Sequence, residues 1–266
     1  MYKLMAIDLD DTLLNDDREI TPATRQALAD AAAQGVIVTI ATGRMYASAS
    51  AIARELRMNV PLITYQGALI KNMLDGEVLY ERTVPADVAQ RVYAHCVEHG
   101  LHLQGYYNDQ LYTREDNDKI IAYAQMSNIP YIVEPDFAGF MRQPQTKLVI
   151  IDDPAKLNEI AGQYREWFGA SAHVVKSKPH FLEIMHPEGT KGSALRFLAS
   201  RFGCAIEQTI GIGDSWNDHD LVETAGLGVA MGNAIDALKQ VADYITATNN
   251  EDGVKQVIDR FILDRI

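Results

Sequence analysis

Two aspartates, Asp8 and Asp10, directly follow the first apolar run of the chain, Leu4-Met5-Ala6-Ile7. An ionised carboxylate at the end of a buried strand is costly unless it has a partner. Asp8 is therefore a candidate nucleophile or metal ligand, and Asp10 reaches the same place after a short bend. Taken alone, two aspartates with one residue between them more often form a solvated turn.

A second acidic motif, Gly213-Asp214-Ser215-Trp216-Asn217-Asp218, follows the apolar run Ile210-Gly211-Ile212. By itself it is more typical of a loop that caps a helix. Beside the first motif its meaning changes, because Asp8 and Asp214 together offer oxygen ligands to a hard divalent cation. Mg²⁺ favours one or two carboxylates, waters and a substrate phosphate over an all-protein cage. The two motifs together predict a Mg²⁺ site.

Two further polar segments have the same kind of position. Thr42-Gly43-Arg44 follows the apolar run Val36 to Ala41, and Lys191 opens an amphipathic stretch that begins at Gly192. A lysine in a first helical turn opposes the helix dipole, so it makes most sense where it shares a bound anion. Arg44 has two readings of equal weight: it pairs with an acidic residue, or it faces an incoming substrate.

The first seventy residues alternate between strand and helix patterns. Thr21-Pro22 predicts a helix start, with a cap and a proline at the first helical position, and Gly35 predicts its end. Helical character returns over Ala47 to Leu56, and Pro61 to Thr64 begins another short buried strand. This alternation is typical of βαβ units in a parallel sheet. Ligands of such sheets bind outside the carboxyl ends of the strands, where the four polar motifs would meet.

The middle of the chain has a different pattern. Leu101 to Tyr107 and Gln110 to Thr113 flank Asn108-Asp109, which predicts a hairpin. Further strand and helix candidates follow, with strands at 147–151, 173–176 and 181–185 and helices near 87–99 and 155–168. Turn-forming residues near 83–85 and 186–189 mark the edges. We therefore expect an α/β fold: a Rossmann-like parallel-sheet core made of residues 1–83 and 187–266, and an inserted α+β cap domain at 84–186.

Composition narrows the partners. The formal net charge of -12 over 266 residues disfavours nucleic acid and anionic membranes as general partners, because both are negatively charged. The two cysteines, Cys96 and Cys204, lack CxxC spacing, so neither a disulfide framework nor a zinc site is indicated. No stretch approaches the roughly 18 apolar residues of a membrane span, and the N-terminus lacks a signal-peptide pattern. We expect a cytoplasmic protein that acts on a small molecule.

Together these motifs resemble the haloacid-dehalogenase (HAD) superfamily of phosphohydrolases, in the Cof-type branch with a type IIB cap. The resemblance covers nearly the whole chain. Besides the motifs above, it includes Gln66-Gly67-Ala68, Phe181-Leu182-Glu183-Ile184, Lys191-Gly192 and Gly228-Val229-Ala230-Met231-Gly232-Asn233-Ala234. It implies a Mg²⁺-dependent phosphatase of class EC 3.1.3.- that hydrolyses small soluble phosphomonoesters, such as sugar phosphates, through an aspartyl-phosphate.

The resemblance also implies a role for each matching residue. Asp8 resembles the nucleophile and Asp10 the general acid/base. The metal ligands would be Asp8, Asp214 and the backbone carbonyl of Asp10, with Asp218 as a supporting carboxylate behind them. The phosphate-binding group implied by the resemblance consists of Leu9, Thr42, Gly43, Lys191 and Asn217.

Two departures from the family pattern are visible, since Asp11 stands where glycine is frequent and Gln66 where asparagine is commoner. Substrate contacts are expected from Arg44 and, in the cap, from Lys178 and His180 in the segment Lys176-Ser177-Lys178-Pro179-His180. The alternatives are a phosphomutase that uses the same intermediate and a non-catalytic protein that binds a phosphate ligand. A zinc site at His95 and His99 is disfavoured because no third ligand lies near them in the sequence.

Overall fold

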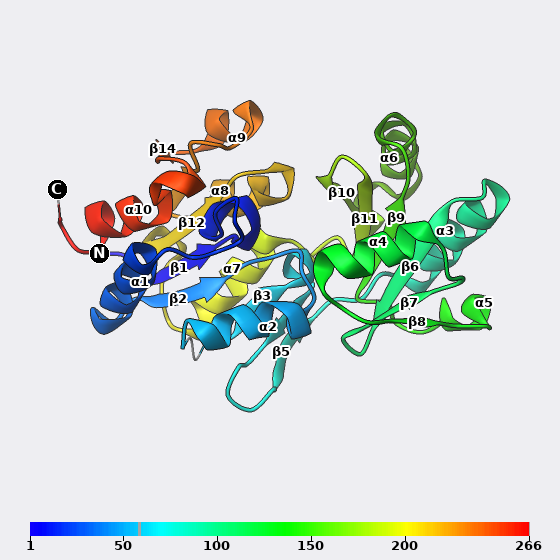
Figure 1. Ribbon diagram of the computed structural model, residues 1–266, viewed down its shortest axis with the longest axis horizontal. Helices are drawn as coiled ribbons and strands as arrows, with labels where there is room; N and C mark the ends of the chain where they lie inside the picture. The colour runs from blue at the N-terminus through cyan, green and yellow to red at the C-terminus, as the bar shows by residue number, and fades with distance from the viewer. Residues whose placement is uncertain (58–59, 266) are drawn as a thin grey trace.

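The computed structural model describes residues 1–57 and 60–265. Two bodies lie side by side along its long axis (Figure 1). The core contains both termini and is built from the N-terminal and C-terminal parts of the chain, and the cap is built from the middle part. This is the α/β fold with an inserted cap that the sequence predicts.

The core sheet is five-stranded and parallel, with β1 between β12 and β2. Its order is β14-β13-β12-β1-β2, and the strand bounds are Leu4–Ile7 (β1), Ile37–Ile40 (β2), Thr209–Gly213 (β12), Leu227–Ala230 (β13) and Tyr244–Ile245 (β14). Strand order reverses at β1, because the chain continues to β2 on one side while β12 pairs on the other. Such a point is where open α/β sheets bind ligands.

Helices cover both faces of the core sheet. They are α1 (Pro22–Ala33), α2 (Tyr46–Glu55), α7 (Lys191–Arg201), α8 (His219–Thr224), α9 (Asp236–Val241) and α10 (Gly253–Phe261). Met5 and Ile7 belong to one apolar cluster with α1 and α10, whereas Leu4 and Ala6 belong to another with α7. A strand buried on both faces is expected to be apolar throughout, as β1 is.

Short-range signals define the starts of α1 and α7. Thr21 caps α1 by accepting a hydrogen bond from the backbone N–H of Thr24, and Pro22 is the first helical residue, as predicted. Thr190 caps α7 in the same way through the N–H of Ser193. Lys191 is therefore the first residue of α7, the position that the sequence predicts for it.

The strand predicted at 61–64 exists but belongs mainly to another sheet. β3 (Leu62–Thr64), β4 (Leu69–Lys71) and β5 (Val78–Glu81) form a three-stranded antiparallel sheet. The parallel sheet is continued only by a single bridge between Ala41 and Ile63. The strand thus lies parallel to the end of β2 at this bridge, as predicted, but it pairs mainly with β4 as a hairpin.

The cap is a six-stranded sheet with helices. Its order is β10-β11-β9-β6-β7-β8, and the bounds are His102–Tyr107 (β6), Gln110–Thr113 (β7), Tyr131–Val133 (β8), Lys147–Ile151 (β9), His173–Lys178 (β10) and Phe181–Met185 (β11). All neighbours are antiparallel except β7 and β8. The predicted hairpin at Asn108-Asp109 joins β6 to β7.

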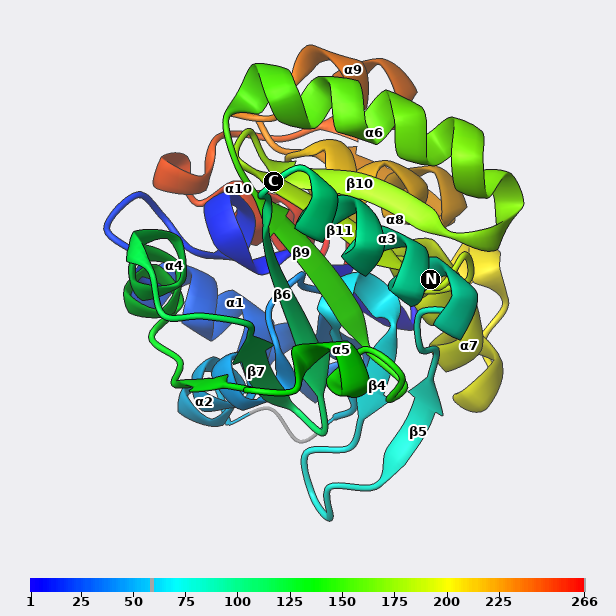
Figure 2. The same cartoon turned by 90° about the vertical axis from the view of Figure 1, so that its right-hand side faces the viewer.

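The cap helices are α3 (Ala86–Glu98), α4 (Asp118–Ser127), α5 (Phe137–Phe140) and α6 (Pro154–Phe168). Figure 2 shows α3 and α6 in front of the cap sheet, on the side away from the core. Leu148 and Ile150 of β9 join the apolar cluster beneath these helices, while Val149 joins the cluster that continues into the core. Because side chains alternate along a strand, Lys147 lies on the face that looks toward the core.

The two segments that connect core and cap run next to each other. Arg82 Nε lies 2.8 Å from Glu188 Oε2, and the hydroxyl of Tyr80 donates to the carbonyl oxygen of Glu188 at 2.9 Å. Within residues 1–57 and 60–265, no helix combines the length and the hydropathy that crossing a bilayer requires.

Candidate active site

The turn after β1 gives the first motif its shape. Residues Leu9–Leu13 form a wide turn, η1, which begins directly after Asp8 and whose backbone is not helical at Asp10 and Asp11. Inside it, Asp11 adopts a φ of 61°, a left-handed conformation that glycine adopts without strain and that aspartate tolerates better than most residues. This explains how aspartate replaces the glycine that is frequent here. The turn directs both Asp8 and Asp10 to the same cavity.

Three carboxylates meet at the ends of β1 and β12. One oxygen from each of Asp8, Asp214 and Asp218 lies within 4.8 Å of the others. Lys191 reaches this group from the start of α7, and its Nζ lies 2.5 Å from Oδ1 of Asp8 and 2.5 Å from Oδ1 of Asp218. The side chain of Lys191 is completely buried. The structure thus brings together the four charged residues that the sequence places far apart.

Asp218 supports the cluster from behind. Its Oδ2 accepts hydrogen bonds from the backbone N–H groups of Asp214 and Ser215, each at 3.1 Å. Gly213 makes this possible, because a Cβ at Gly213 would clash with the side chain of Asp218. Asp218 therefore fixes the direction of Asp214 and holds Lys191 at the same time.

Burial and mutual repulsion change the acidity of this cluster. Burial and the charge of Asp218 raise the pKa of Asp8 well above its ordinary value, and the charge of Lys191 offsets this only in part. Burial and Asp218 also raise the pKa of Asp214 to about 7. Burial disfavours the charged form of Lys191, but Asp218 and Asp8 outweigh it and raise the pKa of Lys191. Negative charge thus exceeds the one buried ammonium that faces it.

The residues present fit a hard divalent cation. The ammonium of Lys191 donates to Oδ1 of Asp8, and the hydroxyl of Thr12 donates to Oδ1 of Asp214 at 2.7 Å. Among the described residues, no hydrogen bond is made to the second oxygen of either carboxylate. Two neighbouring carboxylate oxygens, in a place where negative charge is in excess, are ligands of the kind that Mg²⁺ binds.

The segment Thr42-Gly43-Arg44 lines the same cavity as Asp8 and Asp214. Thr42 is buried, and its Oγ1 accepts a hydrogen bond from the backbone N–H of Arg44 at 3.2 Å. Gly43 packs so closely against Gln66 that a Cβ would clash with the amide of that side chain. Arg44 binds Asp10 through Nε to Oδ2 at 2.9 Å and Nη2 to Oδ1 at 2.6 Å. Arg44 therefore pairs with an acidic residue, and it also lines the cavity, where a contact with substrate stays a prediction.

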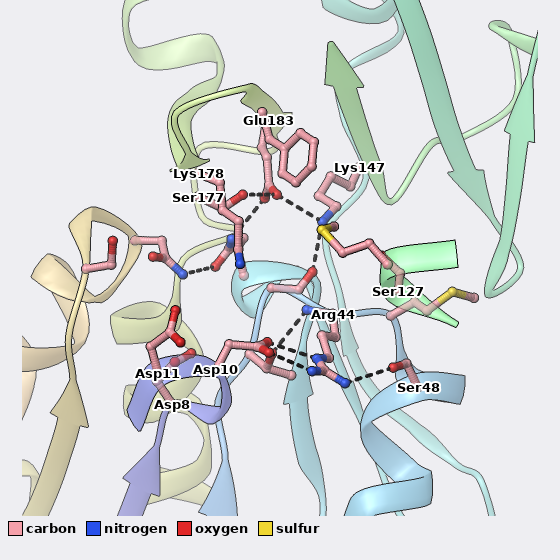
Figure 3. A pocket seen from close by; sticks show the side chains of 18 of the residues that line it. Asp8, Asp10, Asp11, Arg44, Ser48, Ser127, Lys147, Ser177, Lys178 and Glu183 are labelled. Atoms are coloured by element: carbon pink, nitrogen blue, oxygen red, sulfur yellow. Dashed lines mark hydrogen bonds and ion pairs between the residues drawn. The ribbon is translucent and has the colours of Figure 1, made fainter. Parts of the chain in front are cut away.

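A cavity of about 360 Å³ lies between these motifs and the cap. Figure 3 shows Asp8, Asp10 and Arg44 on the core side and Lys147, Lys178 and Glu183 on the cap side. The predicted site residues that line the cavity are Asp8, Asp10, Thr42, Gly43, Arg44, Lys178, Asp214 and Asn217. A cavity of this size suits a small molecule.

Other predicted residues do not face the cavity. The side chain of Leu9 is fully buried in the apolar core, so only its backbone remains as a contact. His180 is exposed, and its Nδ1 lies 3.3 Å from the backbone carbonyl of Asp152, outside the cavity lining. Its neighbour Lys178 does line the cavity. The expectation for His180 is thus not met in this structure, because the hairpin turn between β10 and β11 directs it elsewhere.

Gln66, Lys147 and Glu183 are among the cavity residues that were not predicted as site residues. Glu183 accepts hydrogen bonds from Ser177 Oγ at 2.6 Å and from Gln66 Nε2 at 2.9 Å, and Lys147 Nζ lies 3.4 Å from it. Gln66 in turn accepts from Asn217 Nδ2 at 3.0 Å. A signal for Lys147 and Glu183 exists in the sequence, since each is a single charge inside an apolar strand and needs a buried partner.

The histidine pair is structural. His95 Nδ1 lies 2.9 Å from the hydroxyl of Tyr164, and the rings of His95 and His99 pack at 4.3 Å between centroids. In the part of the chain that the structure describes, the aspartate cluster is the one group of acids, histidines or cysteines close enough to hold a metal ion.

Comparison with known proteins identifies the family. The sequence profile of haloacid dehalogenase-like hydrolases matches residues 5–258. The chain belongs to this family. A crystal structure from Thermotoga maritima is 36% identical, with a TM-score of 0.85 over 98% of both chains. The predicted HAD membership and fold class are therefore confirmed.

Relatives carry more detailed names. A Bacillus subtilis relative, named as a 5-amino-6-(5-phospho-D-ribitylamino)uracil phosphatase, is 31% identical over 265 residues, which cover 98% of this chain and 96% of the relative. A structure described as a HAD subclass IIB sugar phosphatase is 23% identical, with a TM-score of 0.87 over 97% of this chain and 98% of its own. At that identity the likeness concerns the fold, and it matches the type IIB cap arrangement of this HAD protein.

Proposed function

We propose that this HAD hydrolase is a Mg²⁺-dependent phosphatase, which hydrolyses small soluble phosphomonoesters through an aspartyl-phosphate on Asp8. The observation that carries the proposal is the position of Asp8. Its carboxylate is held by Lys191 beside Asp214, and it opens into a small cavity covered by the cap. The names of the relatives support a phosphatase.

Asp8, Asp214 and the backbone carbonyl of Asp10 would hold the ion. When bound, Mg²⁺ supplies positive charge to the phosphoryl oxygens and offsets the repulsion between phosphate and carboxylates. The formal net charge of -12 makes this local positive charge necessary for an anionic substrate.

Asp8 is the nucleophile of the proposed first step. One of its carboxylate oxygens forms a bond to phosphorus while the bond between phosphorus and the ester oxygen breaks. The departing oxygen takes the proton that Asp10 carries. In the second step a water molecule gives a proton to Asp10, its oxygen bonds to phosphorus, and the bond to Asp8 breaks to release phosphate.

Charge neutralisation and positioning account for most of the expected acceleration. General acid–base catalysis contributes roughly 10²–10⁴-fold, whereas enzymes accelerate phosphomonoester hydrolysis by up to ~10²¹-fold. Asp10 therefore supplies a minor share. The larger share falls to the ammonium of Lys191, the hydroxyl of Thr42 and backbone N–H groups that face the transferred phosphoryl group.

The cap side of the cavity favours a polar leaving group. Lys178 and Ser177 line it together with the phenol-bearing side chains Tyr106 and Tyr123, and Arg18 lines it from the core. Hydroxyls and cations at this end suit a leaving group with hydroxyls or a second negative charge. Sugar phosphates and related polyol phosphates meet this description, and the relative whose name gives a 5-phospho-D-ribitylamino substrate supports it.

Phosphate release from a panel of phosphomonoesters tests the proposal, with the Asp8→Asn protein as the blank. We expect catalytic turnover with Mg²⁺, and none from Asp8→Asn. An isomerised product in place of free phosphate would favour a phosphomutase. A single stoichiometric binding or release event without turnover would favour a non-catalytic phosphate-binding protein.

A further inference from the structure

The loop that carries Thr42 and Gly43 is held from several directions. We define the Thr42 loop as residues 42–47, from the end of β2 to the first turn of α2. The carbonyl of Thr42 accepts from the N–H of Gln66 at 3.0 Å, and that of Arg44 accepts from the N–H of Tyr65 at 2.9 Å. Both of these donors belong to the core. The carbonyl between them, that of Gly43, has its donor in the cap.

Lys147 of the cap strand β9 supplies that donor. Its Nζ lies 2.8 Å from the carbonyl oxygen of Gly43. Only 2% of the Lys147 side chain is exposed, and Glu183 at 3.4 Å is its ionic partner. The ammonium also lies 5.2 Å from the ring centre of Tyr106. A lysine this deeply buried needs such partners, so its contact with the loop is a fixed part of the closed arrangement.

Asp109 of the cap holds the other end of the Thr42 loop. Helix α2 has Met45 at its N-cap position, and this side chain makes no capping hydrogen bond. Instead, Oδ1 of Asp109 accepts from the N–H of Tyr46 at 3.0 Å, and Oδ2 accepts from the N–H of Ala47 at 3.0 Å. The hydroxyl of Tyr65 donates to Asp109 as well, at 2.7 Å.

The carboxylate that caps the N-terminus of α2 differs in origin from an ordinary N-cap side chain. The N-cap side chain usually belongs to the residue that precedes the helix, whereas Asp109 lies at the tip of a hairpin in the other body. Asn108 and Asp109 both adopt left-handed conformations, with φ of 51° and 57°, as a two-residue hairpin turn requires. The turn therefore projects a carboxylate onto the positive end of the α2 dipole.

We propose that Asp109 and Lys147 are positioning residues through which the docked cap orders the Thr42 loop for phosphate. This rests on the proposed function of that loop. Neither side chain needs to touch the phosphoryl group, because each acts on the backbone of the loop. A leaving group that favours the docked cap then also strengthens phosphate binding, so the two ends of the substrate are coupled through the protein.

The test compares Asp109→Ala with Asp116→Ala. Asp116 is a matched control, because its Oδ1 accepts from the hydroxyl of Tyr131 at 2.6 Å entirely within the cap. Hydrogen exchange reports the amides of Tyr46 and Ala47, and calorimetry reports the binding of inorganic phosphate in the presence of Mg²⁺. A third variant, Asp109→Asn, keeps an oxygen that can cap α2.

We expect Asp109→Ala to accelerate exchange at the start of α2 by roughly two- to thirty-fold, the effect of losing an N-cap. Its affinity for phosphate should fall by a similar factor, while Mg²⁺ affinity stays unchanged because the aspartate cluster is not on this loop. Asp116→Ala should match the parent protein in all three measurements. Asp109→Asn should recover most of the phosphate affinity.

A fourth variant tests the Lys147 contact. The double variant Lys147→Met with Glu183→Gln removes the hydrogen bond to Gly43 without leaving an unpaired buried charge. It should weaken phosphate binding and leave Mg²⁺ affinity unchanged. The thermal unfolding transition of the double variant, measured alongside, shows whether this variant is folded at the temperature of the binding measurements.

Three outcomes distinguish the positioning role from a purely structural role and from the proposed phosphatase activity. If Asp109→Ala and Asp116→Ala behave alike in exchange and in phosphate affinity, the proposal is overturned. It is also overturned if exchange accelerates while phosphate affinity stays constant, because Asp109 would then only stabilise a helix. If no ester is turned over but both measurements separate the two variants, the positioning role stands and the proposed phosphatase activity fails.

Discussion

Arg44 binds the carboxylate of Asp10 through two hydrogen bonds, from Nε to Oδ2 at 2.9 Å and from Nη2 to Oδ1 at 2.6 Å. Burial works to raise the pKa of Asp10, but the hydrogen bonds and the charge of Arg44 outweigh it, and the pKa is lowered overall. Asp10 is therefore a carboxylate at neutral pH before substrate binds. An anionic phosphoryl group beside it disfavours that charge, which prepares Asp10 to carry the proton that the leaving group needs.

Arg44→Gln should change the pH profile. Without the guanidinium the pKa of Asp10 rises, so its protonated form persists to higher pH. The alkaline limb of kcat/KM for an alkyl phosphate should then move upward by about one to three pH units. Arg25→Gln, which removes a half-buried arginine that pairs with Glu55 outside the cavity lining, is the control. An unmoved limb in Arg44→Gln would show that Arg44 does not set the acidity of Asp10.

Asp10→Asn should affect substrates unequally. Loss of general acid catalysis should slow the hydrolysis of alkyl esters by roughly 10²–10⁴-fold. Nitrophenyl phosphate should be affected less, because nitrophenolate departs without a proton. Steady-state rates on both ester types measure the difference. Equal defects on the two types would argue against the acid role.

Asp214→Asn should stabilise the metal-free protein. The pKa of Asp214 is about 7 in the folded protein, against an ordinary value of 3.8. The folded state therefore binds more protons than the unfolded chain between these values, and its stability falls as pH rises from about 4 to about 7. In excess chelator, Asp214→Asn should melt at a higher temperature than the parent, and by a larger margin at pH 8 than at pH 5. A margin independent of pH would contradict the raised pKa.

Activity should require Mg²⁺ and be inhibited by Ca²⁺. Calcium takes more oxygen ligands at longer distances than magnesium, so it should disturb the approach of Asp8 to phosphorus. Rates measured in chelator, in Mg²⁺ and in mixtures with Ca²⁺ test this. Full activity in excess chelator would remove the metal from the mechanism.

Lys178→Ala and His180→Ala should differ. Lys178 lines the cavity, whereas His180 turns toward Asp152. Lys178→Ala should change the ranking of phosphate esters by kcat/KM, and His180→Ala should leave the ranking as it is. Mg²⁺ affinity should be the same in both. If Lys178→Ala lowers activity uniformly across chemically different esters, Lys178 does not select the substrate.

The sequence alone determined the elements of the core and the meeting of its polar motifs. Apolar runs before Asp8, Thr42 and Asp214 become buried strands because no charged residue interrupts them, and Thr21-Pro22 starts a helix by local capping. Parallel pairing then follows from strand–helix alternation, and it brings the carboxyl ends of the strands together whatever the cap does. The cluster of Asp8, Asp214, Asp218 and Lys191 was predictable for this reason.

Only the tertiary structure decided how the cap meets the core. That Lys147 binds the carbonyl of Gly43, and that Asp109 caps α2, depends on how two separately packed bodies dock. No local pattern encodes such contacts, because each joins residues more than sixty positions apart through backbone groups that every residue carries. The same holds for the hairpin after β10, where the turn alone sends Lys178 into the cavity and His180 away from it.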